Sequence, residues 1–274
     1  MTGKTLTRFV PVTLLIGAVL IAVSEVFLFI DVSNRGGLVM PLESGQSLPK
    51  PKGVVAFIAR YVAINMTVIC WVGYLCVFDG LLTWLARRRG DAAISSLRAR
   101  PHRFIVAWLT SIPVWCLFDW INFAYLRAWV YHGLPPVFGQ RVLGYFLAFA
   151  AISPGMFLAA QWYQHLGMKK LRTVGVRIPF ALQLMWFVLR IICTIYPFVV
   201  RDSIGNLTLW VSLMFLLDPV NHWLGAPSII GDWRAGRWGR TLALMAGGAT
   251  CGLLWELWNY WAIAKWTYDL PFFG

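Results

Sequence analysis

The chain consists of long apolar stretches separated by short segments that carry most of its charges. Each stretch holds about 20 or more mostly apolar residues, which as a helix is long enough to cross the hydrocarbon core of a bilayer. Breaks at Gly, Pro and charged residues set the ends of these stretches. We therefore expect an all-α protein, a polytopic transmembrane bundle of about seven helices. Their predicted ranges are 9–30, 54–86, 104–129, 141–164, 179–200, 207–226 and 241–264.

Basic residues collect in alternate loops. The N-terminal tail and the segments 87–103, 165–178 and 227–240 together hold 15 Lys and Arg, whereas the opposite loops hold 7. Cytoplasmic loops carry this excess in membrane proteins, so we expect a protein of the bacterial inner membrane with its N-terminus in the cytoplasm and its C-terminus outside. The first stretch has a basic start at Lys4 and Arg8 and no cleavage pattern after it, which predicts a retained anchor rather than a signal peptide.

Composition supports the membrane class. Of the 274 residues, 59% are hydrophobic and only 13% are charged, which excludes a soluble enzyme, a secreted disulfide scaffold and a disordered tail. The formal charge of +13 follows from the basic loops, so we expect the lipid bilayer as a partner and no nucleic acid. The five Cys lie inside apolar stretches without a Cys-x-x-Cys pair, and we expect small buried hydrophobic residues.

Two segments of the chain match each other without a gap at an offset of 137 residues. Each has an acid, an Asn three residues later and a Trp-x-Tyr seven residues after the Asn. One helix earlier, a second match pairs an Asp and a Trp at the same five-residue spacing in both copies. We therefore expect a parallel internal duplication (3+1+3), with a first repeat over 1–140, a linker helix and loop over 141–178, and a second repeat over 179–274. The matched residues are Asp119 with Glu256, Asn122 with Asn259, Trp129 with Trp266, Tyr131 with Tyr268, Asp79 with Asp218, and Trp84 with Trp223.

Five acids fall inside predicted spans, where an ionised side chain is costly and should face the bundle interior with a partner. Helical rise places Asp119 and Glu256 in the outer half of the membrane and Asp79 and Asp218 nearer the cytoplasm. The fifth acid is Glu25.

These acids suggest two kinds of role. As an active site, Asp119, Glu256, Asp218 and His222 are candidate acid–base residues, because burial raises carboxyl pKa values and His titrates near neutral pH. As a structural device, the same acids and amides would connect helices through hydrogen bonds. The expected ligand-binding residues, which share helix faces with the acids or supply a counter-ion, are Asn122, Asn259, Asn221, Asp79 and Arg190.

Known catalytic signatures are missing from the sequence. It has no P-loop, dinucleotide glycine motif, His-Glu-x-x-His or Gly-x-Ser-x-Gly. The four His lack the spacing of a helix-borne metal pair, so we expect no metal and no cofactor. We expect Arg60 to extend its charged end toward the membrane surface. The Trp and Tyr of the two Trp-x-Tyr motifs are expected to anchor the chain at the outer boundary.

One motif supports a resemblance. The run Trp255 to Tyr260, followed by Trp266, Tyr268 and Pro271, resembles a group of bacterial integral membrane proteins. The likeness covers the last predicted helix closely and, through the duplication, the third.

A fainter similarity is to the lycopene cyclase domain of carotenoid biosynthesis, which is also built from duplicated membrane units with intramembrane carboxylates. That family's acid motif, a Pro followed by Glu and aromatic residues, is missing here, because the nearest Pro, Pro154, precedes Gly155 and Met156. The resemblance implies an isoprenoid-like ligand but not cyclase activity.

Three hypotheses for function remain open. The first is an enzyme or binding protein for an apolar, lipid- or isoprenoid-like molecule, with the many Trp forming the pocket wall. The second is a transporter of small solutes or a proton-coupled carrier, because the 3+1+3 arrangement resembles the sugar-exporting SWEET family. The third is a non-catalytic subunit or assembly factor of a membrane complex, which would bring membrane protein partners.

Overall fold

The computed structural model describes residues 10–92, 94–200 and 203–269. Lys4, Arg8, Arg201, Pro271 and Gly274, on which parts of the topology and motif predictions depend, lie outside these ranges. The long helices are α1 (Val12–Asn34), α2 (Val54–Arg89), α4 (Pro101–Ile121), α5 (Phe138–Leu166), α6 (Phe180–Val199), α7 (Ser203–Trp223) and α9 (Gly239–Trp261). The short elements are helices α3 (Ser96–Ala99) and α8 (Ile229–Arg234), a π-helical turn (Asn122–Leu126), a 3₁₀ turn (Met168–Lys170), and strands β1 (Trp129–His132) and β2 (Lys265–Tyr268).

The seven predicted segments all form helices, which confirms the all-α class. Five of them are long and apolar enough to cross a membrane, namely α1, α2, α4 with the π turn, α5 and α6. This supports a membrane protein with several spans. Membrane crossing by α7 and α9, with 21 and 23 residues, stays a prediction.

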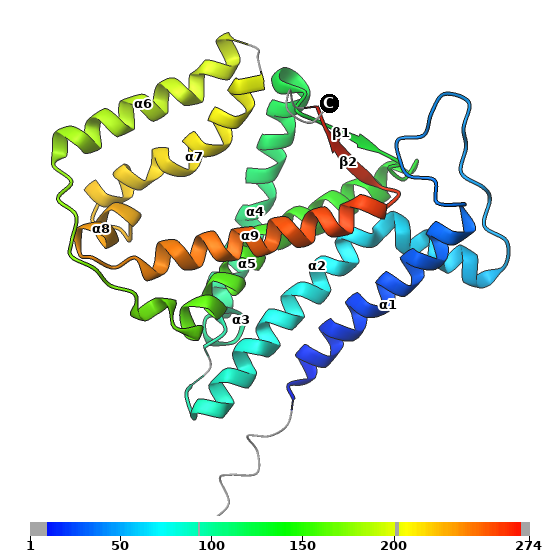
Figure 1. Cartoon of the computed structure of the whole chain (residues 1–274), viewed down its shortest axis with the longest axis horizontal. Helices are drawn as coiled ribbons and strands as arrows, with labels where there is room; N and C mark the ends of the chain where they lie inside the picture. The colour runs from blue at the N-terminus through cyan, green and yellow to red at the C-terminus, as the bar shows by residue number, and fades with distance from the viewer. Residues whose placement is uncertain (1–9, 93, 201–202, 270–274) are drawn as a thin grey trace, which may run out of the picture. The chain divides into compact units, whose positions relative to one another are not determined.

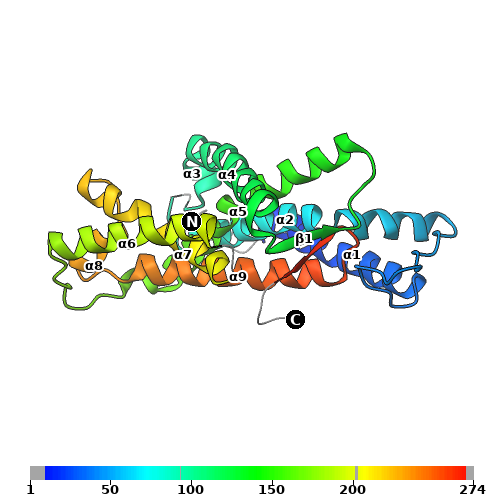
Figure 2. The same cartoon turned by 90° about the horizontal axis from the view of Figure 1, so that it is seen from above.

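The third and seventh helices end slightly before the predicted positions, and strands that were not predicted follow them. Helix was expected to continue through residues 129 and 264, but α4 and its π turn end at Leu126 and α9 ends at Trp261. Arg127 follows the π turn at a φ of +52°, a left-handed conformation that stops a helix. The Trp-x-Tyr motifs then form β1 and β2, which pair with each other (Figure 1, Figure 2).

The chain divides into two compact units. The first contains residues 1–116, 131–162 and 246–267, and the second contains 117–130, 163–245 and 268–274. These units do not coincide with the two expected repeats.

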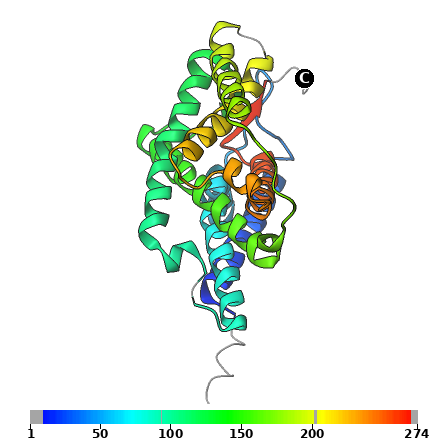
Figure 3. The same ribbon diagram turned by 90° about the vertical axis from the view of Figure 1, so that its left-hand side faces the viewer.

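Helices α1 and α2 of the first unit lie side by side and antiparallel (Figure 1, Figure 3). Three glycines, Gly17, Gly73 and Gly80, allow this close approach. A Cβ atom on Gly17 would lie 2.5 Å from the carbonyl oxygen of Gly73, and one on Gly80 would lie 2.5 Å from the backbone nitrogen of Leu14. Gly73 and Gly80 are two helical turns apart, so they lie on one face of α2, and small residues at such positions are typical of helix pairs in membranes.

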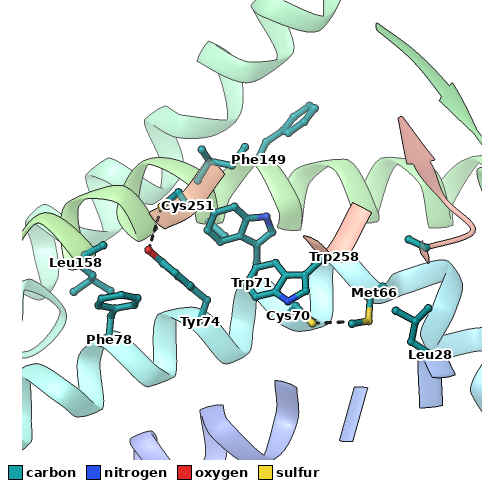
Figure 4. Packing of buried hydrophobic residues seen from close by; sticks show 14 of the residues in the cluster. Leu28, Met66, Cys70, Trp71, Tyr74, Phe78, Phe149, Leu158, Cys251 and Trp258 are labelled. Atoms are coloured by element: carbon teal, nitrogen blue, oxygen red, sulfur yellow. Dashed lines mark hydrogen bonds between the residues drawn. The ribbon is translucent and has the colours of Figure 1, made fainter. Parts of the chain in front are cut away.

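The core of the first unit is built on α2. Trp71, Tyr74 and Phe78 project from it among residues of α5 and α9 (Figure 4). The ring of Trp71 packs edge-to-face against Tyr74 at 5.2 Å and against Trp258 at 5.8 Å, an arrangement that aromatic quadrupoles favour. The tight packing of α2 on α5 requires Gly155, because a Cβ there would lie 2.9 Å from the Trp71 ring. Burial was predicted for all five Cys. Cys70 and Cys251 are buried in this core, whereas Cys76, Cys116 and Cys193 are only partly buried.

In the second unit, α6 packs along α7. The chain turns after α7 at Gly225, where φ is +71°, and continues into α8. The indole N–H of Trp223 donates to Gln183 of α6 at 2.9 Å, which connects the two long helices near the turn.

Candidate functional site

Two of the three expected ligand-binding amides, Asn122 and Asn259, hold the backbone of the strands. Asn259 accepts a hydrogen bond from the Trp266 N–H at 2.9 Å and donates to the Trp266 carbonyl at 2.9 Å. Asn122 makes the same pair of bonds with Trp129, at 3.1 and 2.8 Å. Both amides are buried, so these bonds satisfy backbone groups that would otherwise be costly to bury.

The two acids one turn earlier differ in their surroundings. Asp119 is half-buried and accepts from the indole N–H of Trp129 at 3.1 Å. Glu256 is exposed, contrary to the expectation that it faces the interior, because Trp255 and Trp258 occupy the core side of α9. Of the four residues expected as boundary anchors, Trp129 and Trp266 are buried inside the protein, Tyr131 is half-buried and Tyr268 is exposed.

Asp218 and His222, two of the candidate acid–base residues, bond to other groups rather than to each other. Both carboxylate oxygens of Asp218 accept backbone N–H groups at the start of α8, from Ile229 at 2.7 Å and Ile230 at 2.9 Å. The turn after α7 brings these N–H groups to the carboxylate, and helix N-termini favour negative charge. The exposed Asn221 does not join a buried cluster.

His222 bonds to residues of the same turn. Its Nδ1 lies 3.2 Å from the Ser228 hydroxyl, and its Nε2 lies 2.9 Å from an Arg234 guanidinium nitrogen. This geometry therefore gives no buried proton relay from Asp218 to His222.

Asp79 is fully buried, as expected for an acid inside a span. Its carboxylate accepts from the guanidinium of Arg98 at 2.6 Å, from Ser95 at 2.7 Å and from Thr13 at 3.1 Å. These donors come from α1 and from the segment after α2, so Asp79 connects three parts of the first unit. Arg190, expected as a counter-ion, lies half-buried in α6.

Sequence reasoning missed a buried ionic cluster next to the strands. Asp31 pairs with Arg60 at 2.7 Å and with Arg35 at 3.4 Å, so Arg60 does not simply extend toward the membrane surface. Arg35 is buried and donates to the carbonyl of Trp261. The i, i+4 spacing of Asp31 and Arg35 at the end of α1 was the signal that could have revealed this cluster.

Two further basic groups near this cluster have lowered pKa values. Burial lowers the pKa of Lys265 below 10.5, and the charge of Arg35 adds to this effect while Glu256 opposes it. Burial also lowers the pKa of His132 below 6.5, helped by the charge of Lys265. The ring of His132 bonds to the Thr267 hydroxyl at 2.8 Å, so the neutral imidazole is part of the β1–β2 contact.

A pocket in the first unit is the main candidate site. It lies among α2, α5, the segment around β1 and the end of α9, with a volume of about 90 Å³. Six of its 17 lining residues are aromatic, and three of these are Trp, the residue type that the hypothesis of an apolar ligand expected in the pocket wall. The rings belong to Trp71, Tyr131, Tyr145, Phe149, Trp255 and Trp266.

The charged and buried polar groups of this aromatic pocket include several donors of hydrogen bonds, beside the carboxamides of Asn65 and Gln140, which can also accept. Arg141 lines it, and no carboxylate does so in the described part of the chain. Three buried donors belong to residues of the wall and have no acceptor among the described residues: the hydroxyl of Thr67 and the indole N–H groups of Trp71 and Trp255. A buried donor without an acceptor costs free energy, so a ligand that brings acceptor oxygens would suit this wall.

None of the predicted site residues lines the aromatic pocket. The sequence singled out acids and amides because such residues are rare in spans, whereas this pocket is made mostly of residue types that are common there.

Within residues 10–92, 94–200 and 203–269, no group of three or more His, Cys, Asp or Glu side chains is placed to hold a metal ion. Comparisons of the chain with protein-family models, curated proteins and solved structures gave no match.

Proposed function

We propose that this protein binds an apolar, lipid- or isoprenoid-like molecule with an oxygen-rich, anionic head group in the aromatic pocket. The observation that carries the proposal is the combination of an aromatic wall, one arginine and several donors with no lining carboxylate. Ligand sites are typically apolar clefts with a few placed polar groups. The proposal belongs to the first of the three hypotheses, as a binding protein rather than an enzyme.

The wall selects the apolar part of the ligand. Trp71, Trp255 and Tyr145 offer flat apolar surfaces on different elements, and ring faces pack well against conjugated or branched hydrocarbon chains. The head group would lie by Arg141 and Gln140, at the start of α5. A guanidinium presents several donors to phosphate or carboxylate oxygens.

The positions of the acids favour binding over acid–base catalysis. Asp119 and Asp218 accept structural hydrogen bonds in the second unit, and Asp79 is held by three donors. Glu256 does not line the pocket. A general acid must reach the reacting group of its substrate, and no candidate acid lines this pocket among the described residues.

We also propose that the chain arose by a parallel duplication, with α5 as the linker helix. The order α1, α2, α3, α4, β1 is matched by α6, α7, α8, α9, β2, each with one short helix between long ones. Asp79 and Asp218 both bind the segment that follows their helix, and Asn122 and Asn259 make the same bonds to Trp. These parallels support the alignment that the sequence suggests.

The test of the binding proposal is ligand retention by the purified full chain. Protein in mild detergent would be extracted with organic solvent and the extract analysed by mass spectrometry, for wild type, Arg141→Gln and the exposed control Arg172→Gln. We expect one class of anionic lipid or isoprenoid to be enriched in wild type and the control, and reduced about tenfold in Arg141→Gln, since a hydrogen bond to a charged group contributes about 1.5 kcal/mol or more.

A second variant tests the apolar wall independently of charge. Gly144→Leu fills space at the pocket lining, and a Cβ at Gly144 meets no heavy atom within 4 Å. We expect a stable protein without the enriched ligand. Equal amounts of extracted lipid or isoprenoid from wild type and both pocket variants would refute the proposal. Membrane proteins that co-purify in the absence of a ligand would support the complex-subunit hypothesis instead.

A further inference from the structure

A second cavity, separate from the aromatic pocket, lies at the other end of α5. It has a volume of about 280 Å³ and is formed by residues of α3, the first turns of α4 and the last turns of α5. All of these residues belong to the first unit. We call it the basic groove. Its lining residues are Ser96, Arg100, Arg103, Phe104, Ala107, Pro154, Phe157 and Gln161.

The charged part of the basic groove is entirely positive. Arg100 and Arg103 are exposed, and their guanidinium groups make no hydrogen bond or ion pair with other residues in the part of the chain that the structure describes. No carboxylate lines the groove there. The neighbouring Arg98, by contrast, is held by Asp79. Two arginines thus remain available for an anionic group.

The rest of the basic groove is apolar and lies on candidate membrane helices. Phe104 and Ala107 belong to the start of α4, and Pro154 and Phe157 to α5, and both helices are long and apolar enough to cross a membrane. The polar end is fixed in place, because the Ser96 backbone N–H donates to the Gln161 side chain at 3.0 Å. The charged residues therefore lie at the ends of the helices, and the apolar residues of the groove lie further along them.

We propose that the basic groove binds an anionic phospholipid. The phosphate would lie between Arg100 and Arg103, and one acyl chain would follow Phe104, Ala107 and Phe157. Basic residues next to the end of a membrane span attract anionic lipid heads, and the apolar continuation distinguishes a lipid from a soluble anion. The sequence places this end of α4 and α5 on the cytoplasmic side, where such lipids are accessible from the inner leaflet. This site is independent of the proposed function of the aromatic pocket.

The experiment compares lipid binding by native mass spectrometry on the full chain in detergent. Wild type, the double variant R100Q/R103Q and the control K169Q/K170Q, which removes two exposed charges from the loop after α5, would be titrated with phosphatidylglycerol and phosphatidylcholine. We expect wild type and the control to bind phosphatidylglycerol more tightly than phosphatidylcholine. The double variant should lose about tenfold in affinity for phosphatidylglycerol only.

A third variant tests the apolar part. Ala107→Trp leaves both arginines in place and fills the groove, and it should weaken phosphatidylglycerol binding without a loss of charge. The proposal is overturned if R100Q/R103Q binds like wild type, or if the control loses as much affinity. It is also overturned if glycerol 1-phosphate, which has no acyl chain, competes as well as the intact lipid, because the groove would then bind a soluble phosphate.

Discussion

Single carboxamides hold the two strands β1 and β2 in this protein. Asn122 and Asn259 each use one oxygen and one nitrogen to hold both backbone groups of a Trp seven residues later. Both were predicted as ligand-binding residues from their spacing to an acid. The spacing was informative, but the amides bind the chain itself, because an extended segment after a helix needs partners for its backbone groups.

Removal of one such amide should be costly. For Asn259→Ala we expect a loss of about 2 to 4 kcal/mol in the free energy of unfolding, because two buried backbone groups of Trp266 lose their partners. The measurement is unfolding in detergent followed by Trp fluorescence. The matched control is Asn221→Ala, which removes an exposed amide and should stay within about 0.5 kcal/mol of wild type. Equal stabilities of the two variants would contradict the role of the amide.

Another prediction concerns the pH dependence contributed by His132. Because burial lowers the pKa of this group below 6.5 in the folded protein, the unfolded chain takes up a proton at higher pH than the folded chain does. Stability should therefore fall as the pH drops from 6.5 through the folded-state pKa. We expect a smaller decrease in Tm over this window for His132→Gln than for wild type. Parallel Tm curves for the two proteins would argue against a buried neutral imidazole.

Some residue roles could be predicted from the sequence and others could not. The burial of Asp79 followed from the cost of an unpaired charge in a span. The partners of Asp218 did not follow, because they are backbone N–H groups and any residue type can supply them. The aromatic pocket was also hidden, since it depends on which of 16 Trp face inward together.

At the scale of elements, α1 and α2 pack with their backbones in close contact. Gly80 should not accept a side chain, because a Cβ would lie 2.5 Å from the backbone of Leu14 and backbone cannot move aside cheaply. We expect Gly80→Ala to lower the free energy of unfolding by about 1 to 3 kcal/mol through overpacking. Gly252→Ala in α9 is the control, because nothing lies within 4 Å of its Cβ position, and there Ala should be neutral or stabilising by up to about 1 kcal/mol. The ranking of the two variants by Tm checks the packing, and a Gly80→Ala variant as stable as Gly252→Ala would contradict it.

Element boundaries were predictable where composition changes abruptly. The start of α2 at Val54 and the ends of α5 and α6 lie within a few residues of the predicted positions. The strands were not predicted, because Trp and Tyr after an apolar helix are equally typical of a membrane boundary. The short helices α3 and α8 fall in loops that the sequence described only by their charge.

At the scale of the whole molecule, the number of spans decides where the loop around α8 lies. With seven spans this loop is cytoplasmic, whereas it is outside if α7 does not cross. We expect a cysteine introduced at the exposed Ala235 to react with a membrane-impermeant maleimide only after the cells are permeabilised. Ser44→Cys, in the loop between α1 and α2, is the positive control that should react from outside. Labelling of Ala235→Cys in intact cells would contradict the seven-span topology.

The pairing of β1 with β2 has a consequence for the order of synthesis. His132 and Thr267 touch across a separation of 135 residues, so β1 leaves the ribosome long before its partner exists. During that interval, the four long helices α5, α6, α7 and α9, the short helix α8 and the loops between them must be made, while the edge of β1 has no strand beside it. The sheet can therefore form only late in synthesis, after the helices between the two strands have been made. A chain stalled before Lys265 would present an open strand edge to chaperones and proteases.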